Sequence, residues 1–331
     1  MRALFIPALL GVVLVALGSL MLGPVPLPPS EVFSALLGGS SDQLAQTVVL
    51  SIRLPRVLAA LMVGAGLSSA GVAMQAFFRN PLADPWLIGV APGATLGAVV
   101  ALVSGASFTL WGVTSLPIFA FLGGLGLAVL VTLFATRRGG EVVSVDLLLM
   151  GVALGSVASA LATWLLISTG TRFVGTALSW ITGSLDAVRW PTLTAALWVF
   201  VIGLGLLAAV APRLDYLILP TEEARSMGVP VVALRWSALI SAALLTGAAV
   251  AVAGVVAFVG LIVPHAVRIL VGGVHRRLVP FALLAGAGFM VLVDTLARTV
   301  TTPGLPLSLV TSVVGVPFFI YLLRSKGVRG W

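Results

Sequence analysis

Apolar runs of about twenty residues recur from one end of this sequence to the other, and they constrain its fold more than any other feature. A transmembrane helix needs about 20 apolar residues, and these runs are apolar on every face, unlike the alternating strands of membrane barrels. The sequence therefore predicts an all-α integral membrane protein with about ten transmembrane helices. The approximate spans are 3–22, 55–78, 86–104, 115–135, 146–167, 191–211, 236–258, 260–273, 280–299 and 308–323.

Composition excludes the main soluble alternatives. Hydrophobic residues make up 60% of the 331 residues and charged residues only 8%, about a third of the roughly 25% that is typical of soluble domains. A soluble enzyme, a disordered chain and a nucleic-acid-binding protein are therefore excluded, and the lipid bilayer is the expected surrounding. Little sequence is left for an aqueous domain, so we expect residues 1–331 to form a single transmembrane domain.

The distribution of basic residues predicts the orientation. Ten spans put both termini on one side of the membrane, and a cytoplasmic N-terminus satisfies the positive-inside rule. We therefore expect a multi-pass protein of the cell (inner) membrane with both termini in the cytoplasm. The thirteen inner basic residues are Arg2, Arg79, Arg137, Arg138, Arg213, Arg225, Arg235, Arg268, Arg276, Arg277, Arg324, Lys326 and Arg329. The five outer ones are Arg53, Arg56, Arg172, Arg189 and Arg298.

Two stretches of the sequence, 63–81 and 246–264, resemble each other without a gap. They lie in the second and seventh spans, five crossings apart, so the two copies run in opposite directions. This predicts an inverted internal repeat of spans 2–5 and 7–10, an architecture of transporters, with chance similarity among small residues as the alternative. The small side chains would let helix backbones approach closely. The matched pairs are Gly64/Gly247, Ala65/Ala248, Ala70/Ala253, Gly71/Gly254, Val72/Val255 and Pro81/Pro264.

No motif for catalysis or for a cofactor is present. The sequence has no cysteine and only two histidines, which excludes a thiol nucleophile and a thiolate metal site. There is no GxxxxGK[ST] motif, so the chain should not bind ATP. We expect His265 to be a structural hydrogen-bonding residue rather than a haem ligand, and His275 to lie in a solvated inner loop. The chain is thus expected to be no enzyme and to hold no cofactor or metal.

Four stretches carry a resemblance to a known family. They are RLPRVLAALMVGAGLSSAGVAMQAFFRNPLADPWLIGVAPGATLGA (53–98), LLLMGVALG (147–155), LPTEEARSMGVP (219–230) and VAFVGLIVPHAVRIL (256–270). Together they resemble the FecCD family, the permease subunits of ABC importers for ferric siderophores, haem and vitamin B12. The resemblance implies a type II ABC importer permease. It also implies a homodimer, two ATP-binding cassette subunits that hydrolyse ATP, and a periplasmic or lipoprotein substrate-binding protein. Ferric siderophore is the first cargo expected, before vitamin B12 and haem.

Three outer arginines form a candidate docking site. Arg53 and Arg56 lie on one helix face if Pro55 falls in the first turn, where proline is tolerated, and Arg298 is near the outer end of the ninth span. Guanidinium groups bind carboxylates bidentately, whereas snorkelling to the membrane interface is the alternative. The resemblance implies that Arg53, Arg56 and Arg298 receive acidic residues of the binding protein. Asp294 should pair with Arg298 at helix spacing, with a proton or cation site as the alternative.

A charged inner segment, about 212–235, contains a candidate coupling helix. Thr221 as a cap, two acids in a first turn and Gly228 as a stop predict a short helix outside the bilayer; a plain solvated connection is the alternative. The resemblance implies that this helix enters a groove of the ATPase, with Glu222, Glu223 and Arg225 as polar contacts. The coupling residues are Thr221, Glu222, Glu223, Ala224, Arg225 and Gly228.

The turn after the second span contains a candidate gate. Its prolines force a non-helical backbone, which a membrane protein tolerates only where protein or a cavity surrounds it. The resemblance places a cytoplasmic gate at Asn80 and Leu82 and a second gate element at Ser144 and Val145. Val145 departs from the pair of hydroxyl residues that vitamin B12 permeases of this family have there, and ordinary turns are the alternative for both segments.

Two other classes of membrane protein compete with this interpretation. An ion-coupled secondary transporter is also built from inverted repeats, but it needs ionisable groups or unwound backbone near mid-membrane. The sequence offers little of that kind beyond Asp294. A membrane enzyme would need a clustered acid–base or metal constellation, which the sequence lacks.

Overall fold

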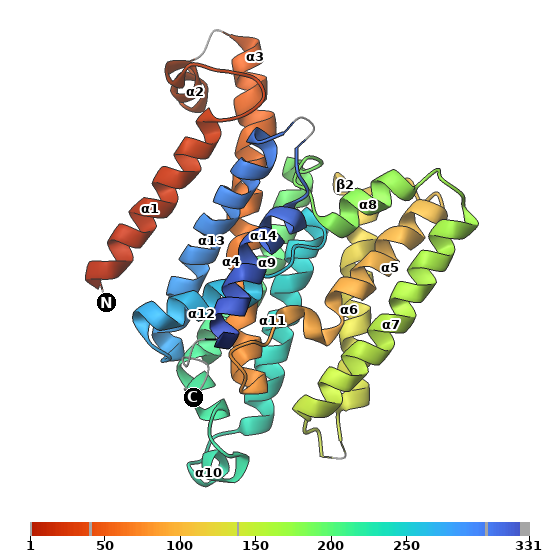
Figure 1. Cartoon of the computed structure of the whole chain (residues 1–331), viewed down its shortest axis with the longest axis vertical. Coiled ribbons are helices and arrows are strands. Elements are labelled where there is room, and N and C mark those ends of the chain that lie inside the picture. Colours follow the sequence, from red (N-terminus) through yellow and green to blue (C-terminus); the bar gives the residue numbers. More distant parts are fainter. Residues whose placement is uncertain (1, 40–41, 138, 302–303, 325–331) are drawn as a thin grey trace.

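The computed structural model describes residues 2–39, 42–137, 139–301 and 304–324. Each predicted span coincides with one helix of these residues (Figure 1). Seven of the helices are long and apolar enough to cross a membrane, and α5, α12 and α14 are shorter apolar helices. The helices are α1 (Arg2–Met21), α4 (Leu54–Phe78), α5 (Val90–Val103), α6 (Ser115–Ala135), α7 (Ser144–Ser168), α9 (Trp190–Val210), α11 (Val231–Ala253), α12 (Val259–Val271), α13 (His275–Thr299) and α14 (Leu307–Arg324).

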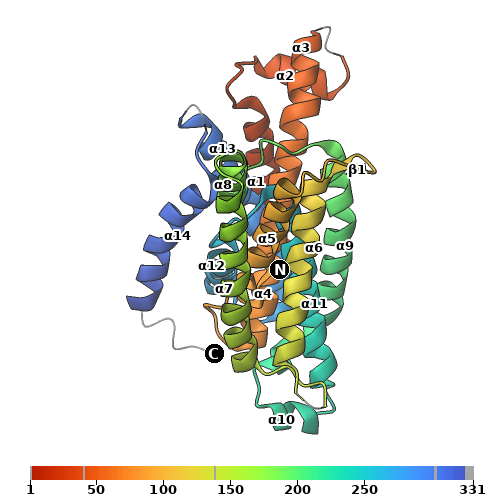
Figure 2. The same cartoon turned by 90° about the vertical axis from the view of Figure 1, so that its right-hand side faces the viewer.

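Short elements mark the two ends of the molecule. Helices α2 and α3 lie at one end and α10 lies at the other (Figures 1 and 2), and we call these the α2 end and the α10 end. The only strands in the described residues form a two-residue hairpin, in which Thr109 pairs with Thr114. The short elements are α2 (Pro29–Leu36), α3 (Gln43–Gln46), the π-helix η1 (Thr47–Arg53), the 3-10 helix η2 (Pro85–Ile88), β1 (Thr109–Leu110), β2 (Val113–Thr114), α8 (Val174–Thr182), the 3-10 helix η3 (Ala211–Leu217) and α10 (Thr221–Ser226).

Helices α4 and α11 form the centre of the bundle. In the most apolar stretch of the continuous helix formed by α3, η1 and α4, 89% of the residues are buried. The corresponding share is 72% in α11 but only 11% in α1. Helix α4 contacts α9, α11, α12 and α13. A helix that is apolar on all sides can be surrounded either by protein or by lipid, so tertiary packing decides that these two are central and that α1 lies at the edge.

Glycine permits a close helix crossing in this centre. A Cβ atom added to Gly64 of α4 would lie 2.0 Å from the carbonyl oxygen of Gly286 of α13, and the reciprocal contact would be 2.3 Å. Beside this crossing, the Ser68 hydroxyl donates a hydrogen bond to the Ala282 carbonyl at 2.8 Å. The prediction that small residues in 63–81 allow close backbone approach is therefore confirmed.

The inverted repeat appears as a shared order of elements. In both α4–α7 and α11–α14, a long buried helix is followed by a break, a short helix and two further helices. The short helices α5 and α12 both start after a left-handed residue, Gly89 at φ 84° and Phe258 at φ 68°. The copies diverge locally, because Gly71 lies inside α4 whereas its counterpart Gly254 follows the end of α11. The two matching stretches therefore share their place in the topology, but their local backbone conformations differ.

The seventh and eighth spans are separated by a non-helical stretch, 254–258. Of the basic residues assigned to the inner side, Arg138, Lys326 and Arg329 lie outside the described residues. Helices α5, α6 and α7 lie side by side in Figure 2, and α14 packs on α12 and α13. This arrangement leaves a face of α7 without a helix of the same chain on it, and most of α7 is exposed.

Candidate functional site

At the α2 end, the three predicted docking arginines converge on one cavity of about 310 Å³. Arg53 ends η1, Arg56 lies in the first turn of α4, and Arg298 comes from the last turn of α13. Asp186, from the loop after α8, lines the same cavity. The sequence placed the arginines near one membrane surface, and the packing of α4 against α13 brings them together.

Two of these arginines cap helix α1. The Arg53 guanidinium donates hydrogen bonds to the carbonyl oxygen of Leu20 at 2.8 Å and to that of Val25. The Arg298 guanidinium donates to the carbonyl oxygen and the hydroxyl of Ser19. A helix C-terminus has unpaired carbonyl groups and favours positive charge. Because both side chains are buried, this contact provides a structural reason for basic residues on the α2 side.

Arg56 joins two carboxylates. Its Nε lies 3.0 Å from both oxygens of Asp294, and its Nη1 contacts Asp186. The Asp294 side chain is 1% exposed and also lies 3.5 Å from Arg298 Nε. The predicted Asp294–Arg298 pair is therefore confirmed, although Arg56 is the closer partner. Asp294 is held as a buried counter-ion between two guanidinium groups.

Asp186 is the exposed member of this cluster, with 76% of its side chain accessible. Partial burial acts to raise its pKa, but the Arg56 guanidinium and the Ser184 hydroxyl outweigh this and hold the pKa of Asp186 below its ordinary value. Asp186 is therefore ionised at neutral pH. With three arginines and two aspartates, the cluster keeps one net positive charge.

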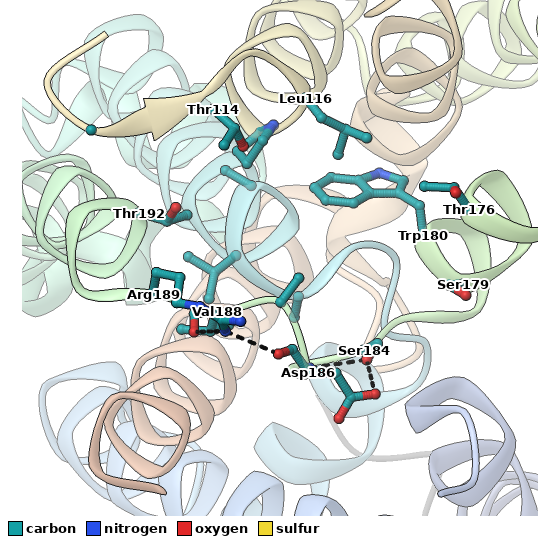
Figure 3. A pocket seen from close by; sticks show the side chains of 16 residues that line it. Thr114, Leu116, Thr176, Ser179, Trp180, Ser184, Asp186, Val188, Arg189 and Thr192 are labelled. Atoms are coloured by element: carbon teal, nitrogen blue, oxygen red, sulfur yellow. Dashed lines mark hydrogen bonds between the residues drawn. The ribbon is translucent and has the colours of Figure 1, made fainter. Parts of the chain in front are cut away.

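A second cavity of about 350 Å³ is also lined by Asp186 (Figure 3). The Trp180 indole extends into it, and residues with hydroxyl groups from β2, α8, the loop after α8 and α9 line the cavity. The loop is tied to α14, because the Leu307 N–H donates to the Gly183 carbonyl at 3.1 Å. The hydroxyl residues that line this cavity are Thr114, Thr176, Ser179, Ser184 and Thr192.

At the opposite end, the predicted short helix is present as α10, but its cap differs from the prediction. The N-cap position is Pro220, so Thr221 is the first helical residue and does not cap the helix. The predicted stop is correct: Gly228 has φ 77°. Its N–H donates to the Arg225 carbonyl at 2.9 Å, and the next N–H donates to the Ala224 carbonyl at 3.1 Å. This is a Schellman motif, for which glycine is the usual residue.

Helix α10 has an inner and an outer face. Thr221 and Arg225 are four residues apart and therefore lie on one side of the helix, where Ala224 is fully buried. The Arg225 guanidinium lies 2.9 Å from Glu222 and 3.4 Å from Glu141 of the loop before α7. Glu222 and Glu223 are exposed, and the Glu222 side chain is 84% accessible.

The second predicted gate segment contacts the last turn of α4, which leads into the first. The Asn80 side-chain oxygen accepts a hydrogen bond from the Leu82 N–H at 2.9 Å, which closes a turn stabilised by the asparagine side chain. Ser144, at the start of α7, donates from its hydroxyl to the carbonyl of Phe77 at 3.4 Å. Val145 is exposed. Segments 67 positions apart in the sequence thus lie against each other at the α10 end.

A groove of about 730 Å³ lies between α5 and α7, and none of the described residues that line it is charged. Glycine lets the two helices approach, since a Cβ on Gly155 would lie 3.1 Å from Pro92. Two of the lining hydroxyls, on Ser156 and Thr163, donate to carbonyls of their own helix and so are already satisfied. The hydroxyl residues of the groove are Thr95, Ser156, Ser159 and Thr163.

The sequence profile of the FecCD transport family matches residues 10–325. The chain belongs to the FecCD transport family. It is 41% identical, over 93% of its length, to the cobalamin import system permease protein BtuC of Halobacterium salinarum, of which 82% is covered. It is 38% identical, over 96% of its length, to the hemin transport system permease protein HmuU of Yersinia pestis, of which 94% is covered.

A solved structure of a metal-chelate type ABC transporter in an inward-facing conformation has the same fold. The TM-score is 0.85 at 34% identity, covering 98% of this chain and 99% of the other. The FecCD chain is therefore the membrane-spanning permease subunit of an ABC importer. The alternative of an ion-coupled secondary transporter is wrong, and the relatives are transport permeases, not enzymes. Membership of the family implies ATPase and substrate-binding protein partners.

The sequence did not indicate three charged residues of these sites, Glu141, Asp186 and Arg235. Each contact joins distant segments: Arg235 meets Glu141 across 94 positions, and Arg56 meets Asp186 across 130. Helical spacing relates only residues three or four apart, so no local pattern could have paired them. A lone acid in a short, otherwise basic loop, as at Glu141, is the only signal available.

One histidine differs from the predictions. His265 is buried, and its ring packs edge-on against Phe318 with 6.4 Å between centroids. Its Nδ1 makes no hydrogen bond to the described residues. His275 is fully buried instead of solvated. It begins α13, and Asp215 accepts its backbone N–H at 3.1 Å and lies 2.6 Å from its Nδ1.

Proposed function

We propose that this FecCD permease forms half of the membrane pathway of an importer for a bulky metal chelate, which is cobalamin, haem or a ferric siderophore. The uncharged groove between α5 and α7 carries this proposal. Its lining of glycine, apolar side chains and four hydroxyl residues, two of which bond to their own helix, offers few groups to retain a large cargo, as conduction requires. The same helix, α7, begins with the gate residues Ser144 and Val145, which act with Asn80 and Leu82.

A second copy of the chain closes the groove. The outward face of α7 is apolar and exposed at Leu149, Val152 and Val157, and in a dimer it would face its counterpart across the pathway. Two ATP-binding cassette subunits engage the two α10 helices through the exposed residues Glu222, Glu223, Arg225 and Gly228, whereas the inner residues Thr221 and Ala224 hold the coupling helix against the permease. The permease itself catalyses nothing and holds no cofactor.

The whole chain acts as one permease domain in the cell (inner) membrane, with the coupling segment at about 212–235 and both termini in the cytoplasm. The distribution of basic residues supports this orientation. The C-terminal ends of α4, α6, α9, α12 and α14, where inner basic residues lie in the sequence, point toward the α10 end (Figure 1). The α2 end, with its arginine cluster, then faces the periplasm or the cell exterior.

Uptake measurements test the function. In proteoliposomes that contain the permease, its ATPase subunits and the external binding protein, we expect ATP-dependent uptake of cyanocobalamin, ferrichrome or hemin. Cyanocobalamin is the first probe because of the 41% identity to the cobalamin permease. Hydrolysis-deficient ATPase subunits are the control. Uptake that survives this control and follows an ion gradient instead would contradict the proposal.

The arginine cluster is the proposed docking site for the binding protein. Arg53 and Arg298 supply positive charge from buried positions, and Arg56 supplies the guanidinium that can be reached from the cavity. Asp186 already forms an ion pair with Nη1 of Arg56, and its own side chain is exposed. A carboxylate of the docked protein would therefore take the place of Asp186, which makes Asp186 an internal competitor.

Two single substitutions should change docking in opposite directions. Asp186→Asn raises the net charge of the cluster from one to two positive charges and frees Arg56, so association should accelerate by roughly twofold to tenfold at low salt. Arg56→Gln should slow it by a similar factor. Stopped-flow association with the binding protein at two ionic strengths provides the measurement. Wild-type rates for both variants at both salt concentrations would rule out docking at this cluster.

A further inference from the structure

Helix α10 is attached to the rest of the chain by side chains that no sequence motif indicated. We propose that Glu141 and Thr221 are positioning residues that transmit the movement of α10 to the two gate segments, at Asn80 and Ser144. This inference rests on the coupling and gate roles proposed above. It adds the residues that join the coupling helix to the gate.

Thr221 connects α10 to the end of α4. Its hydroxyl oxygen accepts hydrogen bonds from Arg79 at 3.5 Å and from Arg235 at 3.4 Å. Arg79 also donates from Nε to the carbonyl of Leu217 at 2.6 Å, just before α10. Since Arg79 directly precedes Asn80, a shift of α10 acts on the backbone of the first gate segment through a single side chain.

Glu141 connects the same helix to the start of α7. One carboxylate oxygen lies 3.4 Å from the Arg225 guanidinium of α10. The other accepts a hydrogen bond from Arg235 of α11 at 3.0 Å. Arg235 therefore contacts both Thr221 and Glu141, and α11, a rigid and mostly buried helix, holds it in place. The two connections share one guanidinium group.

The loop that precedes α7 is short and braced. Thr136 and Val142 form a β-bridge, and the Trp236 indole donates to the Gly140 carbonyl at 3.0 Å. Ser144 starts α7 directly after this braced loop. A displacement of the loop therefore reaches the second gate segment without being absorbed by flexible chain.

Charge makes Glu141 the less replaceable of the two residues. Arg79 and Arg225 both repel Arg235 electrostatically, and the Arg235 side chain is only 10% exposed. Within the described part of the chain, Glu141 is the only carboxylate that forms an ion pair with Arg235. A buried charge that loses its partner is far more unfavourable than an exposed one. Neutralising Glu141 should therefore loosen α10, Arg235 and the loop together.

The test uses near-isosteric variants in the complete complex with its ATPase subunits. For Glu141→Gln and Thr221→Val, we expect normal co-purification with the ATPase, because the outer face with Glu222 and Glu223 is unchanged. ATP hydrolysis should stay within about twofold of wild type. The uptake of cyanocobalamin, ferrichrome or hemin per ATP hydrolysed should fall by at least about fivefold. This factor is the lower end of the usual effect that one coupled site has on another. Because both residues contact Arg235, the double variant should lose less than the product of the two single losses.

A distance measurement adds a readout that needs no cargo. The chain has no cysteine, so spin labels can be placed on Ser226→Cys of α10 and Leu149→Cys of α7, both of which are exposed. In the wild-type background, ATP with vanadate should leave the label distance unchanged, because α10 and α7 move together. In Glu141→Gln and Thr221→Val, the distance should shift.

The matched controls are Arg137→Gln and Asp146→Asn, which break an exposed ion pair beside the same loop that does not involve α10. Both controls should keep the wild-type uptake per ATP. If Glu141→Gln fails to assemble, Arg235→Gln removes the guanidinium that both connections share and serves in its place. If Glu141→Gln and Thr221→Val keep the wild-type uptake per ATP hydrolysed, this inference alone is overturned. The absence of uptake by the wild-type complex would instead overturn the proposed function.

Discussion

Replacing Asp294 with alanine is expected to lower the free energy of unfolding by about 3–5 kcal/mol, the usual loss when one partner of a buried ion pair is removed. Asp294 is 1% exposed and lies between the guanidinium groups of Arg56 and Arg298. Without it, two positive charges would remain in the packed contact between α4 and α13. Thermal unfolding of the purified protein in detergent, followed by loss of the monodisperse peak in size-exclusion chromatography, measures the effect.

Asp186 provides a matched control for this experiment, because it is the other carboxylate bound to Arg56 but is 76% exposed. Exposed ion pairs contribute about 1 kcal/mol or less, so Asp186→Ala should leave the unfolding midpoint almost unchanged. Equal losses for Asp294→Ala and Asp186→Ala would show that burial does not distinguish the two contacts. The assignment of Asp294 as the structural counter-ion would then be wrong.

Reversing the charge of both outer-face acids, Glu222→Lys with Glu223→Lys, should weaken assembly with the ATPase by about a hundredfold, since like charges opposed across an interface cost several kcal/mol. ATP-driven uptake should be lost. Both residues project from α10 into solvent, and extra positive charge at this end agrees with the positive-inside rule. Insertion and folding should therefore remain normal.

Co-purification with the ATPase and uptake per ATP measure this effect. The neutral pair Glu222→Gln with Glu223→Gln is the graded control, and it should lose less than the reversed pair because it adds no repulsion. The Schellman stop at Gly228 and the buried Ala224 are unchanged in both variants. Full co-purification together with wild-type uptake in the reversed pair would mean that α10 does not contact the ATPase.

Most of the architecture could be predicted from the sequence because the bilayer imposes a length on every span. The ten apolar runs correspond to ten helices, including the short α5 and α12. The α10 helix and its stop at Gly228 could also be predicted, since caps depend on a few neighbouring residues. The predicted N-terminal cap, Thr221, was wrong, because Pro220 occupies the N-cap position.

The candidate site was predictable only in its residue types. Arg53 and Arg298 could be identified as exceptional, but their bonds to the end of α1 depend on the packing of α1 along α13. The inner acid Glu141 carried no motif and became part of the site only because its loop meets α10 and α11.

The sequence by itself therefore determined the membrane class, the number and order of the spans, the repeat and the short helix α10, because hydrophobic length and local capping act over neighbouring residues. Only the tertiary structure decided which spans are central and which charges meet. Arg56 and Asp294 are 238 positions apart, and Gly64 meets Gly286 across two helices. Such pairings follow from how helices that are apolar on all sides pack against one another, and that packing leaves no periodic signal in the chain.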